Sequence, residues 1–138
     1  MKLNKRSGFT LLEIIIVIII VGVLASLALP RFFATVEFSR STEALQNASV
    51  VRQSVERCYL GRSGTYVGCV ISALDVENPS TTPGSHFAYI VTGQSATVYT
   101  IQATRGTING GDGTSRIFVE QGLNGVTRSG TGTFIGVR

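Results

Sequence analysis

The chain has 138 residues, the size of a single domain, and its 12 Lys and Arg against 8 Asp and Glu give a formal charge of +4. This basic balance points to nucleic acid or an anionic membrane surface as a partner, but only 14% of the residues are charged, and the mean hydropathy of +0.30 excludes disorder over most of the length. Two Cys and one His are too few for a zinc site built from those ligands, and a single His leaves little choice for the catalytic triad of a Ser/His/Asp protease.

Nearly all of the hydrophobicity lies in residues 9–29, whose only charge is Glu13. A helix of this length is about 30 Å long, the thickness of the hydrocarbon core of a bilayer, so the segment can cross a membrane once. Lys2, Lys5 and Arg6 precede it, and no acid lies among the first 12 residues. The positive-inside rule therefore predicts a cytoplasmic N-terminus, with the bulk of the chain outside.

A cleaved secretory signal peptide is the ordinary alternative, since it also combines positive charge with an apolar run. The run here is longer than the usual apolar region of about 7 to 15 residues. The sequence after it, residues 31–59, continues as a helix-permissive stretch without an A-x-A-like cleavage site in a favourable loop. We therefore expect the span to remain in the mature protein.

Glu13 needs a cationic partner, because an acid at the centre of a membrane helix costs about 2.5 to 3.5 kcal/mol even on insertion scales. The chain offers no cation between residues 9 and 30. A cut between Gly8 and Phe9 would create one, since the new amino group at Phe9 lies four residues before Glu13. The same pair can also form between two staggered helices, in a low dielectric.

Residues 6–13, Arg-Ser-Gly-Phe-Thr-Leu-Leu-Glu, resemble the cleavage motif of type IV pilins and pseudopilins, in leader length, key residues and the apolar run that follows. The resemblance implies that a prepilin peptidase removes the basic leader, residues 1–8, after Gly8 and methylates the amino group of Phe9. It also implies that Glu13 pairs with the amino terminus of a neighbouring subunit, while inner-membrane assembly machinery builds a helical filament from copies of the chain.

Gly22 and Pro30 lie where many members of that family carry helix-weakening residues. Pro30 lacks an N–H and clashes with the turn before it, so we expect a kink or local melting from Gly22 to Pro30. Residues 30–58 then carry apolar positions at steps of three or four, with charges on the other faces. This pattern predicts an amphipathic continuation of the helix, whose apolar side would be buried against a sheet.

Cys58 and Cys69 bracket a turn-rich stretch at the end of that helix. Because the predicted topology places both outside the cytoplasm, a disulfide is the favoured interpretation, and it would contribute about 3 kcal/mol. Two free thiols or a metal pair are the alternatives, but no second pair of ligands accompanies them.

Residues 59–138 are predicted to form an extracytoplasmic loop and an antiparallel sheet, because short alternating segments are separated by turn-forming residues. The strand candidates are residues 86–91, 96–104, 116–121 and, after the Gly-rich stretch 122–132, residues 133–137. With the N-terminal helix they predict an α+β fold, in which a long helix with an apolar transmembrane half and an amphipathic half packs on the sheet.

Other motifs have simpler structural explanations. His86, the only histidine, is expected in a surface or capping role. Residues 107–115 superficially resemble a phosphate or calcium loop, but they lack the P-loop Lys and contain only Asp112 as an acid, which favours a hairpin turn. The glycosylation sequon at Asn47 lies within a helix and is of a kind common by chance. Four phenylalanines fit packing in a filament core better than an electron path: Phe9, Phe32, Phe33 and Phe38.

The sequence therefore predicts a structural subunit of a type IV pilus-like filament, in the inner membrane as a precursor and then in a cell-surface or periplasmic filament. No enzymatic activity, metal or cofactor is expected. A type II secretion pseudopilin or minor pilin is the first alternative, although Asp112 and Glu120 are the only acids after Asn78, which argues weakly against a pseudopilin calcium site. A monomeric, membrane-anchored binding module is the second.

The charge of the chain changes if the leader is removed. Without residues 1–8, the chain has 9 Arg and 8 acids, a net charge of +1. The basic character therefore belongs mostly to the leader, where it orients the precursor in the membrane. DNA is not indicated as a partner, and its binding would depend on arginines clustered on an assembled filament.

Overall fold

The computed structural model describes residues 8–138, so the predicted leader lies outside the described residues except for Gly8. The chain divides into two units, Met1–Thr35 and Val36–Arg138. The described part of the first unit contains most of one helix, and the second unit contains another helix and a sheet.

Helix α1, Leu11–Ser39, is apolar over most of its length and has no buried side chain. It belongs to the one helical stretch within residues 8–138 that is long and apolar enough to cross a bilayer. The helix is continuous through Gly22 and Pro30, so the local melting expected there is not seen in the single chain. A proline removes only one backbone hydrogen bond of the helix, and the turns on either side of Pro30 keep theirs.

A turn at Arg40 separates α1 from α2, Ser41–Gly61. The buried side chains of α2 recur at steps of three or four, which confirms the predicted amphipathic helix; they are Ser41, Ala44, Ala48, Val51, Ser54 and Val55. Most of these side chains are small, which lets the helix backbone lie close to the sheet.

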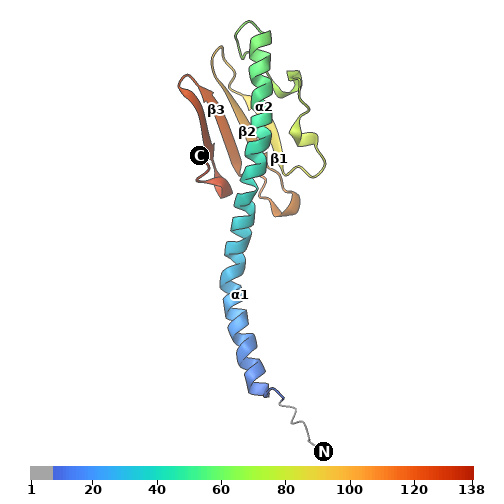
Figure 1. Ribbon diagram of the computed structural model, residues 1–138, viewed down its shortest axis with the longest axis vertical. Coiled ribbons are helices and arrows are strands. Elements are labelled where there is room, and N and C mark those ends of the chain that lie inside the picture. Colours follow the sequence, from blue (N-terminus) through green and yellow to red (C-terminus); the bar gives the residue numbers. More distant parts are fainter. Residues whose placement is uncertain (1–7) are drawn as a thin grey trace, which may run out of the picture. The chain divides into compact units, whose positions relative to one another are not determined.

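The four strands are β1, Phe87–Thr92; β2, Tyr99–Arg105; β3, Arg116–Gly122; and β4, Gly125–Gly130. They form one sheet in the order β1-β2-β3-β4, and each neighbouring pair is antiparallel. Figure 1 shows α2 running across one face of this sheet. Alternate residues of β2 point to that face and are buried, as the sequence pattern predicts for Tyr99, Ile101 and Ala103.

The predicted strand at residues 133–137 is wrong. Gly132–Phe134 form a short 3-10 helix, and the fourth strand lies instead inside the Gly-rich stretch. Gly122 pairs directly with Gly125, which has a φ of 123°, so the two residues between them make a tight turn. Glycine allows this reversal because it has no Cβ, and the Gly-rich stretch is therefore a hairpin rather than a loop.

The hydrophobic core consists of two clusters between α2 and the sheet. One lies beside the C-terminal half of α2 and includes Val51, Tyr99 and Cys69. The other lies towards the N-terminal end of α2, where Phe134 is fully buried and its ring centroid is 5.5 Å from that of Phe87. Burial of Phe134 explains why the C-terminal segment turns inward rather than extending the sheet, since a buried Phe contributes about 1.5 to 3 kcal/mol.

Candidate processing and assembly site

Thr10 caps the start of α1. Its hydroxyl accepts a hydrogen bond from the Glu13 amide at 3.3 Å, and its carbonyl accepts from the Glu13 and Ile14 amides at 3.1 and 3.3 Å. A Thr followed three residues later by Glu is a signature of helix starts, and the carboxylate is favourable near the positive end of the helix dipole. This role of Thr10 was not predicted, although the Thr-x-x-Glu spacing indicates it.

The predicted cleavage bond, between Gly8 and Phe9, lies in the non-helical segment before that cap. Among residues 8–138, and apart from its neighbour in the chain, no atom lies within 4 Å of the position that a Cβ on Gly8 would take. The side chain of Phe9 is 78% exposed. A bond in an exposed, non-helical segment is the kind that a peptidase can reach, so this geometry is compatible with cleavage there.

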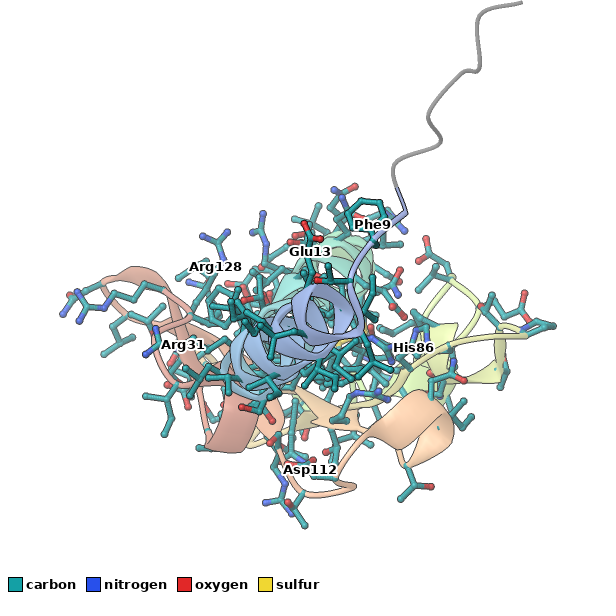
Figure 2. The ribbon with its side chains drawn as sticks, turned by 90° about the horizontal axis from the view of Figure 1, so that it is seen from below. Phe9, Glu13, Arg31, His86, Asp112 and Arg128 are labelled. Atoms are coloured by element: carbon teal, nitrogen blue, oxygen red, sulfur yellow. A yellow bond between two sulfur atoms is a disulfide. The ribbon has the colours of Figure 1, made fainter. Side chains whose placement is uncertain are left out.

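Phe9 and Glu13 lie together at the beginning of α1 (Figure 2). Glu13 is exposed, and none of the ion pairs within residues 8–138 involves it. Its carboxylate therefore still needs the cationic partner inferred from the sequence, at the same depth in the membrane. A new amino group on Phe9 would be four residues before it along the chain.

The large apolar side chains of α1 from Leu11 to Phe33 are exposed on all sides of the helix. Their exposure ranges from 41% at Ile15 to 79% at Leu11. A continuous apolar surface of this size is stable only in lipid or against other protein, because in water it would associate non-specifically. Gly22 and Pro30 lie within this surface. They are more than two helical turns from each other along α1, and Glu13 is also more than two turns from Gly22.

Cys58 and Cys69 form a disulfide, as predicted, with an S–S distance of 2.00 Å and a Cα–Cα distance of 6.0 Å. It joins the last turns of α2 to the following loop, and Cys69 is fully buried in the core. Beside it, Tyr66 from the same loop donates its hydroxyl to Glu56 on α2 at 2.9 Å. Burial raises the pKa of Tyr66 to about 12, so the phenol remains a hydrogen-bond donor at neutral pH.

His86 is half-buried and contacts a carboxylate on α2, so it is neither a free surface residue nor a helix cap. Its Nδ1 lies 2.8 Å from Oε2 of Glu43 on α2, and its backbone amide donates to Oε1 of the same carboxylate at 3.2 Å. The side chain of Asn47, in the sequon attributed to chance, also makes a structural contact, because its amide nitrogen donates to the Tyr89 hydroxyl at 3.1 Å.

Asp112 organises the connection between β2 and β3, which is the hairpin predicted for residues 107–115. Oδ1 accepts hydrogen bonds from the Thr114 and Ser115 amides at 3.0 and 2.9 Å, and Oδ2 accepts from the Ser115 hydroxyl. These donors, the Ser115 hydroxyl first, hold the pKa of Asp112 well below its ordinary value. N–H and O–H groups occupy this carboxylate, so it is not arranged to hold a cation.

Comparison with known proteins adds a match at the N-terminus. Residues 3–29 match the family described as "Prokaryotic N-terminal methylation motif". No solved structure matches the chain.

Curated relatives of two kinds match parts of the chain. The chain is 44% identical over 66 residues to a protein named "Probable minor fimbrial protein" of Dichelobacter nodosus, covering 48% of this chain and 41% of the relative. It is 31% identical over 74 residues to a "Type IV major fimbrial protein FimA" of the same organism, covering 51% and 47%. It is 34% identical over 56 residues to "Type II secretion system core protein G" of Aeromonas hydrophila, covering 41% and 39%. The matched stretches thus span less than half the length of each relative.

Proposed function

We propose that this chain is a structural subunit of a type IV pilus-like filament, because residues 3–29 match the methylation-motif family and type IV fimbrial and type II secretion proteins are among its relatives. In this proposal the precursor resides in the inner membrane through residues 9–29. A prepilin peptidase cuts it after Gly8 and methylates Phe9, and assembly machinery in the inner membrane then adds it to a cell-surface or periplasmic filament.

The exposed apolar surface of α1, with Glu13 in its first turn, supports the proposal most strongly. In the bilayer, lipid covers this surface, and in a filament other copies of the helix replace lipid. The amino group of Phe9 and the carboxylate of a neighbouring Glu13 then neutralise each other in a low dielectric, which favours a defined stagger between subunits. Gly22 and Pro30 would weaken the helix locally and let it adjust its packing.

The main alternative is a pseudopilin or minor pilin, since a minor fimbrial protein and a type II secretion core protein are among the relatives that match. Asp112 bears on the choice. It is one of only two acids after Asn78, and N–H and O–H donors already occupy its oxygens, so a calcium site of several carboxylates has no basis in this part of the chain. We therefore favour a major or minor pilin over a calcium-binding pseudopilin.

The proposal is tested by electron microscopy of sheared surface filaments, combined with mass spectrometry of the subunit. We expect filaments that contain this chain with an N-terminus at methylated Phe9. An uncleaved N-terminus, or no filament containing the chain, would favour the monomeric membrane-anchored binding module instead. Gly8→Asp should stop processing. Gly61→Asp is the matched control, since Gly61 has open space around it and lies outside the motif.

A further inference from the structure

Two carboxylates flank the turn at Arg40, and each is held by a base from the sheet domain. Glu37 lies in the last turn of α1, where Arg105 on β2 binds it. Glu43 lies in the first turn of α2, where His86, just before β1, binds it. The helix is thus attached to the sheet once before the turn and once after it.

The Glu37–Arg105 pair is bidentate. Nε of Arg105 donates to Oε2 of Glu37 at 3.0 Å, and Nη2 donates to Oε1 at 3.1 Å. Nη1 donates to the carbonyls of His86 and Gly106 at 3.2 and 3.0 Å. The Arg105 side chain is fully buried, so a missing acceptor would leave a desolvated charge.

The surroundings of Arg105 are built for a guanidinium. The Phe87 ring lies 5.9 Å from its Cζ. A Cβ on Gly111 would come within 2.5 Å of that Cζ, so Gly111 lets the loop backbone lie against the charged group. The hydrogen bonds from Arg105 are also the main reason that the pKa of Glu37 lies below its ordinary value.

The second attachment uses both ring nitrogens of His86. Nδ1 faces Glu43 at 2.8 Å, and Nε2 lies 3.1 Å from the Asn109 amide nitrogen. The tautomer with hydrogen on Nδ1 satisfies both contacts, because Nε2 then accepts from Asn109. His86 therefore ties α2 to the loop between β2 and β3.

Nothing within residues 8–35 is buried, and the boundary between the two units falls between Thr35 and Val36, directly before Glu37. An exposed helix unwinds cooperatively until it reaches a turn fixed by tertiary contacts. We propose that the pairs Glu37–Arg105 and Glu43–His86 form a two-point clamp that stops unwinding of α1 from spreading into α2. Any role of the clamp in filament assembly rests on the proposed function, whereas the clamp itself is a property of the unassembled chain.

Hydrogen exchange measured by mass spectrometry on the full chain in detergent micelles tests the clamp. In Glu37→Gln and Arg105→Lys, we expect the amides of residues 36–43 to exchange about tenfold faster, because a charged hydrogen-bonded pair is lost or weakened. The amides of β2 and β3 should keep their wild-type rates. Arg105→Lys retains a long, positively charged side chain at the buried site, so it is less disruptive to the fold than a truncation.

A matched control uses another arginine pair. Arg57 and Asp75 form a bidentate pair whose side chains are more than half exposed. Arg57→Gln should change exchange over residues 36–43 by less than about twofold.

Three results would overturn the clamp. The first is unchanged exchange over residues 36–43 in both Glu37→Gln and Arg105→Lys. The second is a uniform acceleration that includes β2 and β3, which would show a general role in stability. The third is an equal acceleration over residues 36–43 in Arg57→Gln. None of these outcomes depends on whether the chain forms filaments, so the clamp and the proposed function can fail separately.

Discussion

The hydroxyl of Tyr99, at the start of β2, donates to Oε1 of Glu56 on α2 at 2.8 Å. The other oxygen of Glu56 accepts from Tyr66 in the disulfide loop. One carboxylate therefore holds the helix, the sheet and the loop together, and the ring centroids of the two tyrosines lie 4.6 Å apart. This contact fixes the end of the domain where α2 stops.

Replacing Tyr99 with Phe should lower the free energy of unfolding by about 1.5 to 3 kcal/mol, because a hydrogen bond to a charged acceptor is lost in a buried site. Denaturant unfolding of the full chain in micelles measures the change. Tyr59→Phe is the control, since the Tyr59 hydroxyl has no hydrogen bond within residues 8–138, and it should change stability by less than about 0.5 kcal/mol. Equal losses in both variants would contradict the bridging role of Glu56.

The domain should lose stability at alkaline pH. Burial raises the pKa of Tyr66 and of Tyr89 to about 12, from an ordinary value of 10.0. A group with a raised folded pKa contributes its full stability below the unfolded pKa and loses it as the pH rises through the folded pKa. Unfolding free energies should therefore fall between about pH 10 and pH 12. Phenolate absorbance that develops fully near pH 10, before any unfolding, would be the contrary result.

Calcium should leave the unfolding temperature unchanged, because the oxygens of Asp112 already accept N–H and O–H groups. Asp112→Asn, in contrast, should lower the free energy of unfolding by about 1 to 3 kcal/mol, since charge-assisted hydrogen bonds in the loop are lost. Thermal unfolding with added calcium, and with a chelator, measures the first expectation. A calcium-dependent rise that disappears in Asp112→Asn would favour a calcium-binding pseudopilin.

Glu13→Ala should leave membrane insertion intact or improve it, because a charge is removed from an apolar segment. Filament yield should fall severely, since the proposed partner of the Phe9 amino group is lost. Membrane fractionation and the yield of sheared filaments separate the two effects. Glu120→Ala is the control, because Glu120 is an exposed carboxylate on β3 without an ion pair in the described chain. Normal filament yield from Glu13→Ala would contradict the pairing.

Sequence periodicity was sufficient to predict α2 and three of the strands, because burial on one face imposes a repeat that local sequence displays. The position of the fourth strand was not predicted. β4 begins at Gly125 and ends at Gly130, whose freedom of conformation suggested a loop, and only its pairing with β3 shows that it is a strand.

The polar contacts that fix the domain also escaped prediction. Arg105 and Glu37 are 68 positions apart, so no local sequence pattern could identify Glu37 as the acceptor for Arg105. Their pairing depends on which face of β2 meets the helix, and on the register of the whole sheet. The processing motif, in contrast, is contiguous, which is why Gly8, Phe9 and Glu13 could be singled out from sequence spacing alone. Their roles remain predictions.

The disulfide has a consequence for the order of events during export. Both cysteines precede every strand in the chain, and only 11 positions separate them. Closing so short a loop needs no long-range pairing, whereas the sheet requires residues as distant as Gly130 to arrive. If the segment that follows the membrane span is exported in chain order, the end of α2 can therefore be fixed covalently before any strand has a partner, and the strands can then pack against a helix that is already closed at its end.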